Sequence, residues 1–153
     1  MSAHRPEYLI VGSGLVGRAV AGTLVRAGDE AVLASRTPGA GLPAPWTAMD
    51  ATDRATCARV VEAVRPDAVV LVHGPSDVTW CEEHPVRAAR AHTAVAANLA
   101  ATAGDRRMVL VSTDNVFAGT APVNDEAAPA RPANAYGAAK LAAERTVPAG
   151  AQP

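Results

Sequence analysis

The stretch Tyr8–Gly17, which reads YLIVGSGLVG, decides the fold of this chain. Its apolar first half is typical of a buried strand, and a pattern typical of a helix follows the glycines. In that context the spacing GxGxxG predicts a strand, a tight turn and a helix that together bind a dinucleotide. Gly12 permits the tight turn, Gly14 lets the backbone approach a pyrophosphate, and Gly17 allows the helix to pack closely on the strand.

The start of this helix supplies the polar part of the predicted site. Its first residues, Leu15 and Val16, would direct backbone N–H groups that have no helical partner toward the phosphates. Glycine-rich turns also occur in unrelated folds, so the motif needs support from the rest of the chain.

The composition narrows the class of protein. The chain has 153 residues, about the size of one domain. Hydrophobic residues make up 49% of the chain but aromatic residues only 3%, so the core must consist of aliphatic side chains. The net charge of −1 gives no electrostatic reason to expect nucleic acid or a membrane surface as a partner. Cys57 and Cys81 lie in no metal or redox motif, so we expect two core residues and no metal.

No signal region begins the sequence, and no apolar segment reaches about 18 residues. The expected location is therefore the cytoplasm.

Strand patterns and helix patterns alternate along the chain. The apolar run Ala68–Val72 is typical of a strand buried on both faces, and the Ala-rich segment Pro85–Ala103 is typical of a helix. The other predicted strands are Tyr8–Gly12, Ala31–Ala34, Trp46–Met49 and Met108–Val111, and the other predicted helices are Leu15–Ala27, Thr52–Val64 and Ala133–Thr146. This order predicts an α/β fold, a Rossmann-type doubly wound parallel sheet of about five strands, in one NAD(P)-binding domain over residues 1–153.

The residues after the second and third predicted strands bear on the cofactor. NAD-binding domains usually place an Asp or Glu at the end of the second strand, where it bonds the ribose 2′-hydroxyl. Here Ser35 and Arg36 stand at that place, and an arginine can pair with a 2′-phosphate. We therefore expect NADP(H) to be preferred and NAD(H) to be possible; the alternative is a solvated Arg36 in a surface loop. Asp50 and Ala51 stand where such folds often meet the adenine ring, although an isolated Asp is as common in a turn.

His73 and Gly74 follow the fourth predicted strand, at the carboxyl edge where a doubly wound sheet binds its ligand. They would line the nicotinamide side of the site. A structural role for His73 in its loop is an equally good interpretation.

Two further motifs indicate carbonyl chemistry. The sequence Ser112-Thr113-Asp114 follows the fifth predicted strand, and Tyr136-Gly137-Ala138-Ala139-Lys140 lies in the last predicted helix. Tyr136 and Lys140 share one face of that helix, so the ammonium can lower the pKa of the phenol and ready it for proton transfer. The alternative is an ordinary helix with a packed tyrosine and an exposed lysine. Together with the glycine motif, the pattern favours a nicotinamide-dependent reductase of carbonyl groups.

These motifs resemble those of the extended short-chain dehydrogenases/reductases, in particular the dTDP-4-dehydrorhamnose reductase branch of sugar-nucleotide reductases. Residues 112–119, STDNVFAG, are close to that family's STDYVFDG, and residues 132–144, PANAYGAAKLAAE, are close to its PxNxYGxSKxxGE. The resemblance covers nearly all of this chain but only about the first half of a family member.

The resemblance implies a role for each catalytic residue. Tyr136 would give its proton to the carbonyl oxygen, Lys140 would lower the Tyr136 pKa and bond the nicotinamide ribose, and Thr113 would bond and polarise the same carbonyl oxygen. The expected function is an NADP(H)-dependent reductase of a keto sugar nucleotide, or its cofactor-binding half. Two alternatives stay open, a reductase of another small carbonyl compound and a non-catalytic cofactor-binding or regulatory subunit.

The sequence also departs from that family. The glycine turn is one residue shorter than the family's GxxGxxG, Asn115 replaces a tyrosine, and Ala139 replaces a serine. The substrate-binding region and a sixth strand would follow where this sequence ends. We therefore expect a cofactor half-site that reduces sugar nucleotides poorly by itself, and an open sheet edge covered by a partner chain or a second copy, as in a homodimer.

Overall fold

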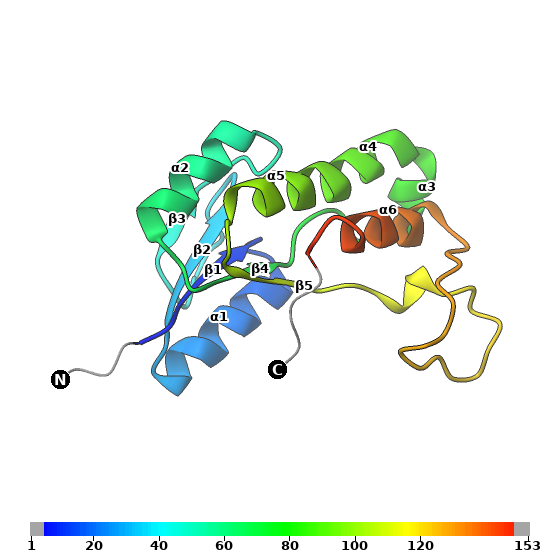
Figure 1. Cartoon of the computed structure of the whole chain (residues 1–153), viewed down its shortest axis with the longest axis horizontal. Helices are drawn as coiled ribbons and strands as arrows, with labels where there is room; N and C mark the ends of the chain where they lie inside the picture. Colours follow the sequence, from blue (N-terminus) through cyan, green and yellow to red (C-terminus); the bar gives the residue numbers. More distant parts are fainter. Residues whose placement is uncertain (1–4, 149–153) are drawn as a thin grey trace.

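A five-stranded parallel sheet forms the centre of the molecule (Figure 1). The computed structural model describes residues 5–148, so both ends of the predicted domain lie outside the described residues. The strand order is β3-β2-β1-β4-β5, which is the predicted Rossmann-type arrangement. The strands are β1 (Glu7–Val11), β2 (Glu30–Ser35), β3 (Trp46–Ala48), β4 (Ala68–Leu71) and β5 (Arg107–Leu110).

Helices cover both faces of the sheet, as a doubly wound fold requires. Figure 1 shows α1 on one face and α2, α4, α5 and α6 on the other. The helices are α1 (Leu15–Ala27), α2 (Arg54–Val64), α3 (Val78–Glu83), α4 (Pro85–Ala89), α5 (Val95–Thr102) and α6 (Ala135–Glu144), with a π-helical turn η1 (Arg90–Ala94) and a 3₁₀ turn η2 (Asp114–Val116).

The alternation of side chains along β1 divides the aliphatic core in two. Leu9 and Val11 pack with α2, α5 and α6, whereas Ile10 packs on the α1 side. All four residues of β4 are buried, as the apolar run predicts. Both predicted core cysteines are buried free thiols.

The strand register brings the predicted site residues to one edge. Val11 at the end of β1 is paired with Ala34 of β2 and with Leu71 of β4. The residues that follow these three strands therefore emerge side by side. The chain order reverses between β1 and β4, which is the switch point where open α/β sheets bind ligands.

The prediction of one continuous helix over Pro85–Ala103 is wrong in detail. The helix changes to the π form over Arg90–Ala94 and returns to the α form at Val95. The wider turn holds His92, which is 1% exposed and hydrogen-bonded to Pro75, so a contact outside the helix accompanies the change. The small helix α3 is absent from the prediction because six residues carry no clear periodicity.

The remaining differences lie at element boundaries. α2 begins at Arg54 because Asp53 caps it, accepting a hydrogen bond from the Ala55 amide.

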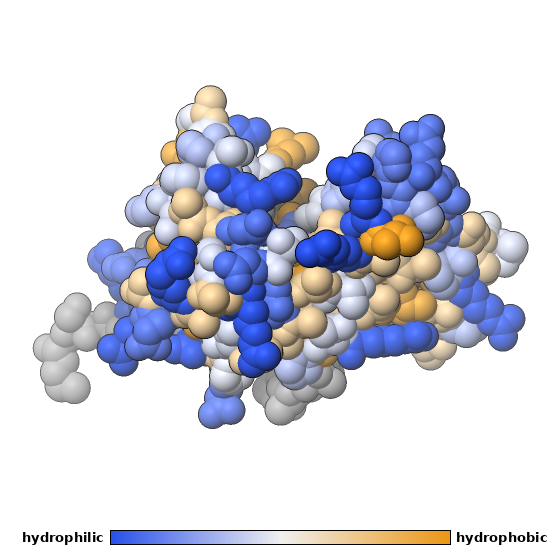
Figure 2. Space-filling view, turned by 90° about the horizontal axis from the view of Figure 1, so that it is seen from above, coloured by the Kyte–Doolittle hydropathy of each residue, from blue (hydrophilic) through white to orange (hydrophobic). Residues whose placement is uncertain are grey.

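In the helix-covered view of Figure 2, polar and apolar residues are intermixed on the surface. Among the described residues, no helix has the length and apolar character needed to cross a bilayer.

Candidate functional site

The glycine turn after β1 has room for a Cβ at only one of its three glycines. A Cβ on Gly12, whose φ is 121°, would lie 2.6 Å from the Val72 carbonyl oxygen. A Cβ on Gly17 would lie 1.9 Å from the carbonyl oxygen of Gly12. By contrast, a Cβ on Gly14 would meet nothing within 4 Å. The backbone at Gly14 therefore faces open space, which fits a turn that a pyrophosphate approaches.

The N-terminus of α1 opens beside this turn. The Arg18 amide donates to the Gly14 carbonyl at 3.0 Å, and the amides of Leu15 and Val16 precede it in the first turn. The side chains of Leu15 and Val16 are 80% and 49% exposed. This end of the helix is therefore accessible and suited to an anion.

A cavity of about 810 Å³ lies at the carboxyl ends of β1, β2 and β4, within the size range of small-molecule sites. Eight predicted cofactor residues line it: Gly12, Gly14, Ser35, Arg36, Asp50, Ala51, His73 and Gly74. The structure therefore brings together residues from four separate loops. The predicted residues Leu15, Val16, Gly17, Thr113, Tyr136 and Lys140 do not line it.

Ser35 and Arg36, at the end of β2, have different surroundings. The Ser35 hydroxyl donates to the Thr37 carbonyl at 2.7 Å, accepts from Trp46 Nε1 at 2.9 Å, and lies 2.7 Å from the Ser13 hydroxyl. Ser35 thus holds the loop together. Arg36 is exposed, and within residues 5–148 its guanidinium makes no hydrogen bond or ion pair. Arg36 is therefore the residue of this pair that is free to bind an anion.

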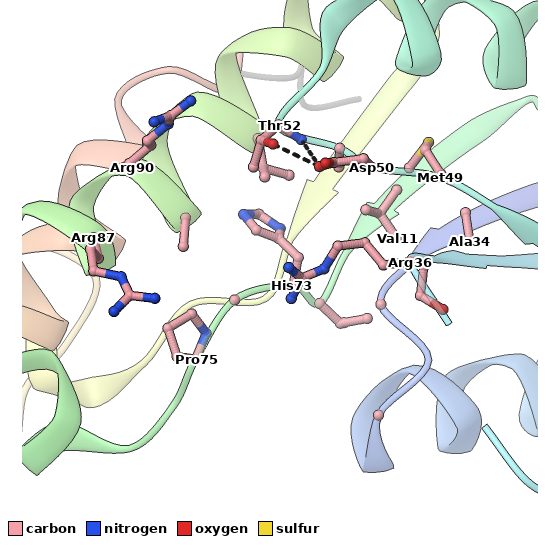
Figure 3. Close-up of a pocket in the computed structure, with 18 of the residues that line it drawn as sticks. Val11, Ala34, Arg36, Met49, Asp50, Thr52, His73, Pro75, Arg87 and Arg90 are labelled. Atoms are coloured by element: carbon pink, nitrogen blue, oxygen red, sulfur yellow. Dashed lines mark hydrogen bonds between the residues drawn. The ribbon is translucent and has the colours of Figure 1, made fainter. Parts of the chain in front are cut away.

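Asp50 has a fixed place at the end of β3. Its Oδ1 accepts from the Thr52 hydroxyl at 2.7 Å and from the Thr52 amide at 3.0 Å (Figure 3). These bonds, aided by the positive charges of Arg36 and Arg90, lower the pKa of Asp50 below its ordinary value. The carboxylate is thus ionised at neutral pH and faces the cavity.

His73 lines the cavity near the end of β4, and the ring of His92 lies next to it. His73 Nε2 donates to the His92 carbonyl at 3.1 Å, and His92 Nε2 donates to the Pro75 carbonyl at 3.0 Å. Burial lowers the pKa of His73 to about 4 and also lowers that of His92, so both rings are neutral at physiological pH. A Cβ on Gly74 would lie 2.3 Å from His92 Cε1, so the site requires glycine there.

His92 also links the cavity to the predicted catalytic helix. Its ring lies 5.7 Å from the ring of His73 and 5.7 Å from the ring of Tyr136. The sequence prediction omitted His92, although a single histidine in an Ala-rich helix was a usable signal.

The surroundings of Lys140 contradict the exposed lysine of the alternative interpretation. Lys140 is 3% exposed, and its ammonium donates to the Val111 carbonyl. Burial lowers the Lys140 pKa, while nearby Glu144 acts in the opposite direction. A buried ammonium on the same helix as Tyr136 is the arrangement that the catalytic interpretation needs.

Thr113 lies in a turn that packs against α6. Its hydroxyl accepts from the Asn115 amide and from Asn115 Nδ2, at 3.2 and 3.1 Å. A Cβ on Gly137 would lie 2.0 Å from the Asn115 carbonyl oxygen, so the helix and the turn touch at backbone distance. Within residues 5–148, no hydrogen bond joins Thr113, Tyr136 and Lys140 to one another.

Three lining residues that the sequence prediction omitted come from the far wall of the cavity. Trp80 lies in α3, Arg87 in α4, and Arg90 begins the π-helical turn. The Arg87 guanidinium carbon lies 5.5 Å from the centre of the Trp80 ring. In Figure 3, Arg36 reaches into the cavity from the side of β2, opposite Arg87 and Arg90.

α3 also contacts α6. The Glu82 carboxylate accepts a hydrogen bond from the Ala135 amide at the first residue of α6. The same short helix therefore lines the cavity with Trp80 and caps the helix that carries Tyr136.

Comparison with solved structures supports this description of the fold. A UDP-glucose 4-epimerase from Brucella ovis in complex with NAD is 21% identical over 92% of this chain and 46% of its own, with a TM-score of 0.85. A dTDP-4-dehydrorhamnose reductase from Bacillus anthracis in complex with NADP is 23% identical over 96% and 50%, with a TM-score of 0.74. A dTDP-4-dehydrorhamnose reductase from Clostridium acetobutylicum is 27% identical over 92% of this chain and 48% of its own, with a TM-score of 0.74.

The chain thus spans about half the length of these relatives. The comparison with curated protein sequences found no match. Epimerases and reductases are both among the similar structures, so the likeness does not separate these two activities. The sequence profile of one family matches residues 8–152. The chain therefore belongs to the NAD dependent epimerase/dehydratase family.

Proposed function

We propose that this chain binds NADP(H) and forms the cofactor-binding part of a reductase of a keto sugar nucleotide. One observation carries the cofactor choice: the end of β2 presents the unpaired guanidinium of Arg36 and no carboxylate. A hydroxyl-bonding acid at this place would repel a 2′-phosphate, whereas an arginine attracts it. The similar reductase from Bacillus anthracis was solved in complex with NADP.

The cavity residues fit the parts of a dinucleotide. The amides of Leu15 and Val16 and the open face of Gly14 would receive the pyrophosphate. Asp50 and Ala51 would meet the adenine ring at the end of β3. His73 and Gly74 would line the nicotinamide side.

The proposed reduction uses residues next to the cavity. The bound cofactor supplies the hydride, and Tyr136 gives its proton to the carbonyl oxygen. The Lys140 ammonium has three N–H donors and uses one on Val111, so two are available for the Tyr136 phenol and a ribose hydroxyl. Thr113 would donate to the carbonyl oxygen in place of its contact with Asp114.

The test of this function compares NADPH with NADH by fluorescence titration. We expect NADPH to bind more tightly than NADH. The variant Arg36→Ala should weaken NADPH binding by about tenfold or more and leave the affinity for NADH nearly unchanged. Arg26, an exposed arginine of α1 that hydrogen-bonds Thr23, provides the matched control Arg26→Ala. Equal affinity of the native chain for both cofactors would refute the NADP(H) assignment.

A second candidate function is a non-catalytic cofactor-binding subunit. The hydrogen bonding of Thr113 and Lys140 favours it, because they bond to Asp114 and Val111 and, within residues 5–148, no hydrogen bond joins either of them to Tyr136. Turnover of a 4-keto sugar nucleotide with NADPH that Tyr136→Phe abolishes would decide for the reductase. If the chain binds NADPH but shows no turnover, even with a partner chain, the subunit interpretation stands.

A further inference from the structure

Three arginines line the cavity, and only Arg36 has been given a role. Arg87 and Arg90 are exposed and face the cavity from the opposite wall (Figure 3). Within residues 5–148, neither makes a side-chain hydrogen bond or an ion pair. Asp50 is the one acidic residue among those that line the cavity. The rim is therefore strongly positive, which indicates a ligand with more negative charge than one arginine balances.

Asp50 distinguishes Arg90 from Arg87. Arg36 and Arg90 both act electrostatically on the Asp50 carboxylate, one from each side of the cavity. The Arg87 guanidinium lies instead against the Trp80 ring. One charged group thus lies at the end of the cavity where we propose that the adenine binds, and it consists of Arg36, Asp50 and Arg90.

Charge balance at this end requires a second cation. A 2′-phosphate carries between one and two negative charges, and next to Asp50 it would also meet a carboxylate. Arg36 alone would compensate only the charge of Asp50. Arg36 and Arg90 together leave a net positive charge for the phosphate and offer two planar sets of N–H donors.

We infer that Arg90 is a second determinant of NADP(H) specificity, which holds the 2′-phosphate from α4's side of the cavity while Arg36 holds it from the side of β2. This inference rests on the proposed NADP(H) binding. The position of Arg90 supports it, since Arg90 begins the π-helical turn and its neighbours Ala91 and Val95 also line the cavity. Arg90 is exposed, so its truncation should leave the fold intact.

The experiment isolates the phosphate from the rest of the cofactor. Adenosine 2′,5′-bisphosphate and 5′-AMP, which differ only in the 2′-phosphate, are titrated calorimetrically into the native chain and into Arg90→Ala, Arg36→Ala and Arg87→Ala. We expect Arg90→Ala to weaken bisphosphate binding about tenfold and to change 5′-AMP binding less than about twofold. The control Arg87→Ala should change both ligands by the same factor. Arg90→Lys should recover part of the preference, because it keeps the charge but not the planar donor pair.

The outcomes separate this inference from the proposed function. If Arg36→Ala abolishes the preference for the bisphosphate and Arg90→Ala does not change it, the role of Arg90 is refuted and NADP(H) binding stands. Equal weakening of both ligands by Arg90→Ala also refutes it, since Arg90 would then contact a group that both share. If the native chain binds both ligands equally, the inference and the NADP(H) assignment fail together.

Discussion

Asn134 Nδ2 donates a hydrogen bond to Asn115 Oδ1 at 2.8 Å, and this bond joins the cap of α6 to the turn that carries Thr113. Asn134 Oδ1 also accepts from the Gly137 amide at 2.8 Å. One side chain therefore starts the helix of Tyr136 and fixes it against the neighbouring turn. Asn115 departs from the tyrosine of the reductases that this sequence resembles, and the bond gives it a structural purpose.

Replacement of Asn134 should destabilise the protein. Asn134→Ala removes the cap and the bond to Asn115, and we expect a loss of about 1–2 kcal/mol in the free energy of unfolding. Urea denaturation of the native chain and the variant measures this difference in the free energy of unfolding. Asn124→Ala in the exposed loop before α6 is the matched control and should change stability by less than about 0.5 kcal/mol. Equal effects of the two variants would contradict the capping role.

The glycines of the first turn should separate stability from binding. Gly17→Ala would bring a Cβ within 1.9 Å of the Gly12 carbonyl oxygen, so we expect a loss of about 3 kcal/mol or failure to fold. Gly14→Ala places its methyl group in open space and should keep the melting temperature but weaken NADPH binding. Thermal melting with and without NADPH distinguishes them. Undiminished NADPH affinity of Gly14→Ala would place the pyrophosphate elsewhere.

The free energy of unfolding should decrease as the pH is lowered, because of the buried histidines. The pKa of His73 is about 4 in the folded chain against 6.5 for an unperturbed histidine, so the unfolded chain binds more protons between these values. The folded state is favoured fully above the unfolded pKa and loses this advantage as pH decreases toward the folded pKa. We expect a loss of about 2 kcal/mol from His73 between about pH 7 and about pH 5.

The variant His73→Gln, which does not titrate, should remove most of this pH dependence and leave a smaller part from His92. Urea denaturation at several pH values checks it. An unchanged slope in His73→Gln would show that the loss arises from other groups.

Lys140 should reduce the stability of the folded chain. Burial lowers its pKa, so the folded state has to hold a poorly solvated ammonium. We expect Lys140→Met to raise the free energy of unfolding by about 1 kcal/mol, despite the lost bond to Val111. The same variant should weaken NADPH binding. A marked loss of stability would instead make Lys140 a structural residue.

The edge strand β5 should cause self-association. β5 is the last strand of the sheet on its side, and Val109 and Val111 are 44% and 38% exposed. We expect sedimentation at micromolar concentration to show dimers that Val109→Lys reduces, because a charge on an edge strand opposes pairing. Leu15→Lys, at an equally apolar but distant exposed site, is the control. A monomer in both cases would refute this contact.

The sequence predicted the sheet well because its signals are local. The run Ala68–Val72 and the glycine motif each carry their own periodicity and turn chemistry, and the strand order follows from their alternation. The π-helical turn was not predictable from local patterns, since the contact that accompanies it joins His92 to Pro75, 17 residues away in the chain. Arg87 and Arg90 belong to no motif in the sequence. Their place in the cavity depends on how α4 packs, which local patterns do not contain.

The short helix α3 contacts two parts of the molecule that lie far apart in the sequence, the cavity and the start of α6. Trp80 lines the cofactor cavity, and Glu82, two residues later, caps the helix of Tyr136. We therefore expect a substitution that shifts α3 to change both cofactor affinity and the position of Tyr136. In directed evolution of this chain, residues 77–84 should therefore be replaced together by the matching segment of a relative. Single substitutions there would improve cofactor affinity or the position of Tyr136 at the expense of the other.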